Sequence, residues 1–132
     1  MVEKVSFDMH RIQNMTTQTQ QAPNIQNCGW GINIDASLNQ YIIFADNCLV
    51  GQRYRYDPTS DYLQSQNGLD KSISIDSSSL TDIVFVPPLS QVYINGQPDQ
   101  TGIVKLYISG NPNNAKYIKI TSFGSISVDT MK

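Results

Sequence analysis

The sequence predicts an α+β fold, with an N-terminal amphipathic helix packed on antiparallel β-sheets. Two observations give this class. A helical pattern of apolar residues is confined to residues 2 to about 19, and Pro23 ends it. Beyond Pro23, β-prone runs separated by turns recur about every ten residues, which is typical of antiparallel sheets. The 132 residues suffice for one core. We expect one folded unit, with a helix at 1–22 and a β-rich domain at 23–132.

The predicted helix carries an apolar stripe at 3-4-3 spacing, formed by Val2, Val5, Met9 and Ile12. No N-cap residue precedes Val2 apart from the initiator methionine, as expected where a longer helix has been cut. We interpret the stripe as candidate helix packing and assembly residues. It mainly covers the sheet, and its flanks are candidates for contact with partner helices.

Residues 28–48 are predicted to form a β-hairpin. The chain can turn at 36–40 if Asn39 takes a left-handed conformation. A three-residue loop would pair Ala36 with Gln40. This register sets three pairs opposite each other on one face: Ile34 with Ile42, Ile32 with Phe44, and Cys28 with Cys48.

That register predicts a disulfide between Cys28 and Cys48, because cysteines opposite each other in a non-hydrogen-bonded antiparallel pair can be close enough to bond. The alternative is two buried free thiols. A disulfide would indicate maturation outside the reducing cytosol.

The remaining β-prone runs follow in order along the chain. Asn67-Gly68 and Asn95-Gly96 are predicted turns, and residues 110–114 form another. The predicted strands lie within 61–70, 72–75, 82–86, 91–94, 103–109, 116–121 and 125–128.

Catalytic and metal chemistry find little support in the sequence. The single histidine, His10, would have to serve any Ser-His-Asp or Cys-His arrangement, and no nucleophile motif accompanies it, so we interpret it as a solvent-facing helical residue. Four oxygen-bearing residues around one loop suit calcium by type but lack a calcium-loop spacing: Asp46, Asn47, Asp57 and Asp61. We expect no enzyme activity, no cofactor and no metal.

Four consecutive residues alternate arginine and tyrosine and are candidates for ligand contact: Arg53, Tyr54, Arg55 and Tyr56. On a strand the arginines share one face and the tyrosines the other, whereas in a loop all four could gather. Arginines beside aromatics can hold phosphate or stack on single-stranded bases. The alternative, which we favour, is an edge segment whose tyrosines pack while its arginines stay in water.

Net charge and hydropathy further limit the classes of protein to which this chain can belong. The formal net charge is -2 and charged residues make up 15%, so the chain lacks the basic excess of a general nucleic-acid binder. No apolar run reaches the length of a membrane span, and no signal peptide is visible.

Taken in order, these segments resemble the minor pseudopilins of the GspH and FimT type, which are type IV pilin-like proteins. The resemblance covers most of the chain. It rests on the helix end at 2–18, followed by Cys28-Gly29-Trp30-Gly31-Ile32, the strand at 41–46, the run at 83–88 and the final strand–glycine–strand at 118–128.

The resemblance implies a structural role in the cell envelope. Such subunits have a leader that is cut by a prepilin peptidase and then an N-methylated apolar half-helix, which anchors them in the inner membrane before assembly. The globular domain is then periplasmic or extracellular. The implied partners are other pilin or pseudopilin subunits, and the membrane through the missing half-helix. The alternative is a DNA- or glycan-binding module at a pilus tip or cell surface.

One departure bears on nucleic-acid binding. Some FimT-like pilins bind DNA through a Gly-Arg-x-Arg pattern near the C-terminus, and here Gly124 is followed by Ser125-Ile126-Ser127. The arginines are missing. Lys116 and Lys119 lie nearby in the sequence, but two lysines do not make a basic patch.

Overall fold

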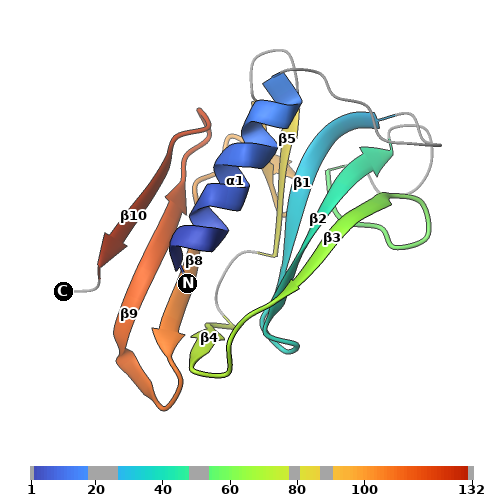
Figure 1. The fold of residues 1–132 in the computed structure, drawn as a ribbon. Helices are drawn as coiled ribbons and strands as arrows, with labels where there is room; N and C mark the ends of the chain where they lie inside the picture. The colour runs from blue at the N-terminus through green and yellow to red at the C-terminus, as the bar shows by residue number, and fades with distance from the viewer. Residues whose placement is uncertain (1, 18–26, 48–53, 78–80, 87–90, 131–132) are drawn as a thin grey trace.

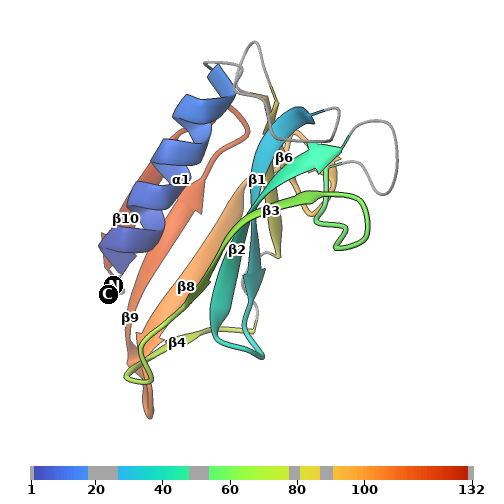
Figure 2. The ribbon, with the colours of Figure 1, turned by 45° about the vertical axis from the view of Figure 1, so that its right-hand side comes forward.

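The computed structural model describes residues 2–17, 27–47, 54–77, 81–86 and 91–130. It contains one helix, α1 (Val2–Thr17), followed by antiparallel strands, so the predicted α+β class is confirmed. α1 lies alongside two sheets, with β8, β9 and β10 on one side and β1, β2 and β3 on the other (Figure 1). After a 45° turn α1 is seen in front of β10 and beside β9, with β1, β2 and β3 to the right (Figure 2).

The first sheet has six strands in the order β3-β2-β1-β5-β6-β7. Its central strands are rich in β-branched and aromatic residues, as buried strands are. The strands are β1 (Asn27–Asp35), β2 (Gln40–Asn47), β3 (Tyr62–Gly68), β5 (Asp82–Val86), β6 (Gln91–Ile94) and β7 (Gln97–Pro98).

The second sheet has four strands in the order β10-β9-β8-β4. In β8 buried residues alternate with partly or fully exposed ones, so this sheet has one face on the core and one in water. The strands are β4 (Ile73–Ile75), β8 (Gly102–Ile108), β9 (Asn111–Ile120) and β10 (Ile126–Thr130).

One apolar core joins the helix to both sheets. Val5, Met9 and Ile12 of α1 are buried in the same cluster as Ile32 of β1 and Ile118 of β9. α1 contacts β1 and β5 of the first sheet and β9 and β10 of the second. Within the part of the chain that the structure describes, no helix is both long and apolar enough to cross a bilayer.

The predicted register of the first hairpin is wrong by one residue. Asp35, not Ala36, pairs with Gln40, so the turn has four residues, 36–39. The Asp35 carboxylate accepts hydrogen bonds from the Ser37 hydroxyl at 2.7 Å and the Leu38 N–H at 3.1 Å, which holds the longer turn closed. Asn39 is left-handed, as expected, with φ of 52°.

Relative to β1, this shift moves every side chain of β2 to the face opposite the predicted one, because side chains alternate along a strand. Ile32 faces Ile43 and Ile34 faces Tyr41, so these four residues line the core. Phe44, which was predicted on that face, instead lies on the other face of the sheet.

The shift also removes the basis of the disulfide prediction. The β1–β2 register changes once more between Asn27 and Trp30, so Cys28 is not placed by the simple alternation that we used. Cys48 lies outside the described residues. The Cys28–Cys48 disulfide therefore stays a prediction.

Several turns also differ from expectation in their position. Asn67 and Gly68 continue β3 instead of forming a turn, and Gly68 pairs with Gln40. β9 already begins at Asn111, inside the stretch predicted as a turn. Asn95-Gly96 does turn the chain, with φ of 51° and 81°.

Candidate functional site

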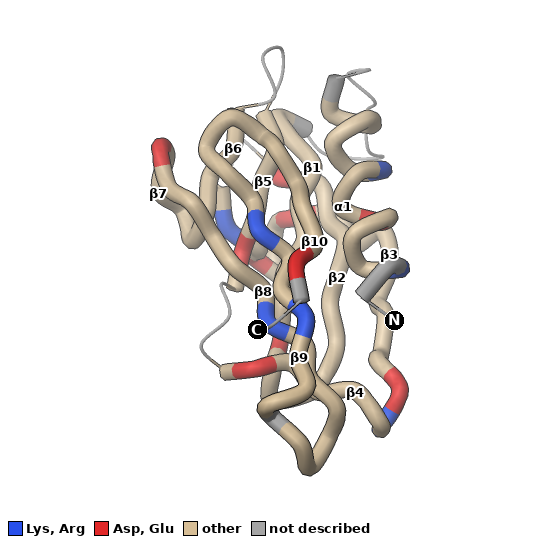
Figure 3. The backbone as a smooth tube through the Cα atoms, turned by 90° about the vertical axis from the view of Figure 1, so that its left-hand side faces the viewer, with Lys and Arg blue, Asp and Glu red and all other residues tan. Residues whose placement is uncertain are grey.

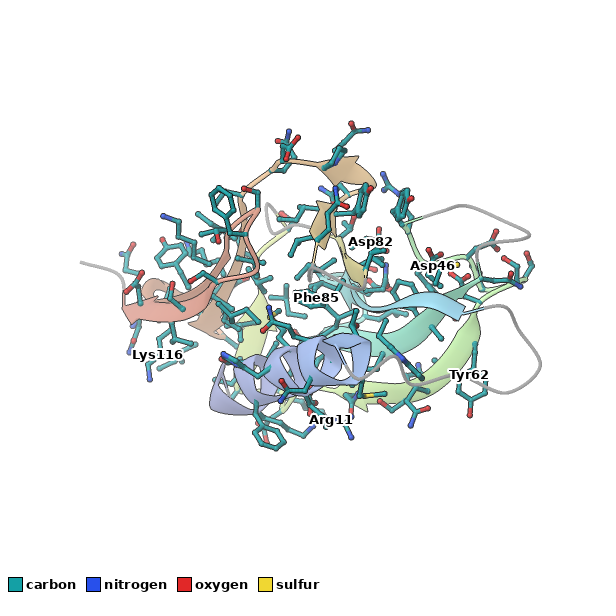
Figure 4. All side chains as sticks on the ribbon, turned by 90° about the horizontal axis from the view of Figure 1, so that it is seen from above. Arg11, Asp46, Tyr62, Asp82, Phe85 and Lys116 are labelled. Atoms are coloured by element: carbon teal, nitrogen blue, oxygen red, sulfur yellow. The ribbon has the colours of Figure 1, made fainter. Side chains whose placement is uncertain are left out.

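The outer face of the first sheet, turned away from α1, is covered by residues 54–57 of the β2–β3 connection. Figure 4 labels Asp46 and Asp82 on this side of the strands, opposite α1 and its Arg11. Phe44 and Val84 also belong to this face and are completely buried. The Tyr56 ring packs on Phe44 with ring centroids 5.1 Å apart.

Two carboxylates fix the backbone of this connection. Asp46 Oδ2 accepts the Tyr54 N–H at 3.2 Å, and Asp82 Oδ1 accepts the Tyr56 N–H at 3.0 Å. Asp82 Oδ1 also accepts the Asn33 side-chain amide at 3.0 Å. Both aspartates are buried, so the N–H groups that satisfy them are worth more than exposed hydrogen bonds.

Arg55 makes internal contacts. One guanidinium nitrogen donates to the Asn95 carbonyl at 2.9 Å and another lies 3.7 Å from Asp82 Oδ2. The Arg55 stem packs over Gly96, where an added Cβ would lie 3.2 Å from it. This guanidinium is therefore engaged with the protein itself, although part of the side chain is exposed.

The Arg/Tyr candidates are thus a loop, not a strand, over the part that the structure describes. Tyr54 and Arg55 lie in a turn, and the Tyr54 ring stacks on Tyr93 of β6. Arg53 lies outside the described residues. No local sequence pattern indicates the partners Asp82, Tyr93 and Asn95, which are distant along the chain.

A second polar cluster, centred on Asp61, links the two ends of the β2–β3 connection. Asp61 Oδ1 accepts the Asn47 N–H and Oδ2 accepts the Asp57 N–H, both at 2.8 Å. The pKa of Asp61 is raised to about 6, chiefly by burial and in part by the nearby charges of Asp46 and Asp57, against the lowering effect of the two N–H donors. No group of three or more metal-binding side chains occurs within the described ranges.

On α1, the predicted packing residues Val5, Met9 and Ile12 are core residues, which leaves them no surface for a partner. The Val2 side chain lies outside the described part. His10 is exposed, and its Nδ1 lies 2.9 Å from the Ser6 carbonyl.

A polar cluster that the sequence did not suggest fastens α1 to β2. The Tyr41 hydroxyl donates to Asp8 Oδ2 at 2.6 Å, and Lys4 Nζ donates to both groups, at 3.1 Å to Asp8 and 3.0 Å to Tyr41. Burial raises the pKa of Tyr41 to about 12. The helix is therefore held by hydrogen bonds as well as by its apolar stripe.

Among the α1 side chains that the structure describes, Phe7 is the most exposed apolar one, at 66%. It lies among exposed polar residues of α1, including Lys4, His10 and Arg11. The sequence analysis did not identify Phe7 as a contact candidate, because this residue lies outside the apolar stripe of the helix. Because aromatic residues are enriched at protein–protein interfaces, this exposed ring is a candidate contact for another protein.

The charges of the second sheet are mixed. In the view of Figure 3, basic segments on β8 and β9 lie beside an acidic one on β10. Lys105 of β8 lies 3.7 Å from Asp76, and Lys119 pairs across the strands with Ser127. Within the described residues this face is no continuous basic surface of the kind that binds nucleic acid.

Comparison with known proteins gives one informative match. No family model and no curated protein matches the sequence. A solved structure, the minor pseudopilin EpsH from the type 2 secretion system of Vibrio cholerae, superposes with a TM-score of 0.64 over 97% of this chain and 92% of that chain. The identity is 10%. The chain has the fold of a GspH-like minor pseudopilin. The sequence-based resemblance is thereby confirmed at the level of fold.

Proposed function

We propose that this chain is the globular part of a minor pilin or pseudopilin subunit, which acts by assembly into a type II secretion pseudopilus or a type IV pilus. The observation that carries the proposal is the match of nearly the whole chain to the fold of a minor pseudopilin. The role is structural, without enzyme activity, in the cell envelope.

In this proposal α1 continues an N-terminal apolar half-helix that anchors the subunit in the inner membrane before assembly. The exposed surface of α1 around Phe7, formed with Lys4, His10 and Arg11 and here called the Phe7 face, then contacts a neighbouring helix. Phe7 supports this assignment because its ring is largely exposed although the helix beneath it is firmly held by Val5, Met9 and Ile12. Burying a phenylalanine ring on assembly yields about 2 kcal/mol.

Photo-crosslinking in the native cell envelope tests the proposal. The full-length protein would carry p-benzoylphenylalanine in place of Phe7 or, as a control, in place of exposed Thr59 in the β2–β3 connection. We expect crosslinks to pilin-like subunits from position 7 and few from position 59. Equal labelling at both positions, or crosslinks only to unrelated proteins, would contradict the proposal.

Substitutions separate assembly from folding. Phe7→Glu should abolish incorporation into the filament and leave the thermal midpoint of the purified domain unchanged. Met9→Ala, in contrast, removes a completely buried side chain and should destabilise the domain by about 3 kcal/mol. If Phe7→Glu assembles normally, the Phe7 face is not the contact surface.

We also propose the Cys28–Cys48 disulfide, in keeping with maturation outside the cytosol. It would close a loop of about 20 residues and stabilise the fold by about 3 kcal/mol. Intact mass after alkylation, with and without prior reduction, checks it. Two alkylated thiols in unreduced, air-exposed native protein would refute the bond.

A further inference from the structure

Tyr54 has an unfavourable backbone conformation and an unfavourable ring-stacking geometry. Its backbone is left-handed, with φ of 65°, which is rare for a large side chain. Its ring lies on Tyr93 with centroids 3.7 Å apart and planes 3° from parallel, whereas tyrosine pairs ordinarily prefer offset or tilted contacts. Such conformations persist where the surroundings enforce them, and they concentrate at ligand sites.

The surroundings do enforce this one. The Tyr54 N–H is held by the Asp46 carboxylate on one side, and the next two residues are held by Asn95 and Asp82 on the other. The stacked rings are therefore ordered before any ligand arrives. Preorganised aromatic side chains bind with little loss of conformational entropy.

The strand register identifies the neighbours of the stack. Pro98 of β7 is directly opposite Tyr93, and Gln91 lies two residues before Tyr93 on the same face of β6. Both neighbours are exposed, and both tyrosines are half-buried. The stack thus has an apolar ring on one flank and a side-chain amide, which both donates and accepts hydrogen bonds, along the strand.

The charges around the Tyr54–Tyr93 stack indicate which class of ligand it can bind. Four aspartates lie around this connection, namely Asp46, Asp57, Asp61 and Asp82, while the described cation there, Arg55, is engaged with Asp82 and Asn95. A surplus of carboxylates repels phosphate groups, which disfavours nucleic acid. Aromatic rings beside neutral amides suit a neutral ligand with an apolar face and hydroxyl groups.

We propose that the Tyr54–Tyr93 stack is a binding platform for a neutral saccharide chain, with a sugar ring lying on the aromatic surface and its hydroxyl groups reaching Gln91. The site is separate from the Phe7 face and does not depend on the assembly role. Its test uses the isolated domain, so its failure is distinguishable from failure of filament assembly.

The test is an NMR titration of the domain with tri-N-acetylchitotriose and with neutral glucans. We expect shifts concentrated at Tyr54, Tyr93 and Gln91 that saturate at about millimolar ligand. The informative variant is Tyr54→Gly, because glycine adopts a left-handed backbone freely while the ring is lost. It should fold and bind at least about tenfold more weakly, the loss expected for one stacking contact.

Tyr117→Ala is the matched control, since Tyr117 is a half-buried tyrosine on the second sheet and lies beside Lys105. It should bind as the unaltered domain does. The proposal is overturned if no saccharide shifts the three residues, if the shifts map elsewhere, or if Tyr54→Gly binds normally. Salt-sensitive binding of oligo(dT) at the stack, in place of saccharide, would also overturn it.

Discussion

The two sheets of this domain bury their faces differently. The first sheet is covered on both faces: α1 lies on one side and residues 54–57 on the other, so that β2 and β5 are buried along most of their length. The second sheet has α1 on one face only, and β8 alternates between buried and exposed positions. A substitution on an outward-facing position should therefore be costly in the first sheet and nearly neutral in the second.

The largest effect is expected for Gly31→Ala. An added Cβ at this position in β1 would lie 2.6 Å from the Phe44 ring and 2.7 Å from the Ile83 carbonyl oxygen. The backbone oxygen cannot move aside cheaply, so we expect a loss of about 3 kcal/mol in the free energy of unfolding. Urea unfolding measures this loss.

Gly68→Ala is the control for the same substitution at an open position. Nothing lies within 4 Å of an added Cβ there, although Gly68 is also in the first sheet, at its edge in β3. We expect a change below about 0.5 kcal/mol. Equal losses in the two variants would show that the outer face of β1 is not packed as described.

The next comparison sets Val84→Thr against Ile103→Thr. Val84 is completely buried on the outer face of the first sheet, whereas Ile103 on β8 is 47% exposed. Threonine at 84 places a hydroxyl in a completely buried position and should cost about 1–2 kcal/mol. Threonine at 103 should cost less than about 0.5 kcal/mol. Similar losses of stability in the two variants would contradict the proposed difference in burial between the outer faces of the two sheets.

Because both faces of the first sheet are buried, the register between β1 and β2 could not be predicted from the sequence. The run Tyr41–Ala45 is apolar at nearly every position, so alternation alone does not indicate which residues face the core. The deciding feature was the turn, where the Asp35 carboxylate accepts two hydrogen bonds and adds a fourth loop residue. The bounds of β8 were predicted within one residue, but its sequence is also largely apolar, and its alternation appears only in the burial of its side chains.

The candidate site was predictable in composition but not in geometry. Alternating arginine and tyrosine identified Tyr54, Arg55 and Tyr56 as candidates. Their partners come from remote segments: the Asn95 carbonyl that holds Arg55 is 40 residues away. Such long-range contacts leave no local periodicity. Phe7 was missed for a different reason, since a single exposed apolar residue breaks no helical pattern.

The attachment of α1 to β2 gives a third effect of similar size. Tyr41→Phe removes the hydroxyl that donates to the buried Asp8 carboxylate, so Asp8 keeps Lys4 but loses its shortest hydrogen bond. We expect a loss of about 1–2 kcal/mol by urea unfolding. Tyr107→Phe, on the half-exposed face of β8, should leave stability unchanged within about 0.5 kcal/mol. An unchanged Tyr41→Phe would mean that the polar cluster does not hold the helix.

The smallest effect concerns the pH dependence of the segment that covers the first sheet. The pKa of Asp61 is about 6 in the folded protein against 3.8 for an ordinary aspartate, chiefly because burial disfavours the charged form. The folded state therefore holds the Asp61 proton over a pH range in which the unfolded chain has released it. Raising the pH from about 4 to about 6 should remove stability through this group.

Asp61→Asn isolates this contribution. Asp35 and Asp70, whose pKa values are lowered by hydrogen bonds, act in the opposite direction but equally in both proteins, so they cancel in the difference. From pH 4 to pH 7 the original domain should lose about 1 kcal/mol relative to the variant, a value that allows for the partial exposure of the loop. A constant difference across this range would mean that Asp61 has the same pKa in the folded and the unfolded states. The carboxylates beneath residues 54–61 would then be well enough solvated that the cover of the first sheet is looser than its hydrogen bonds indicate.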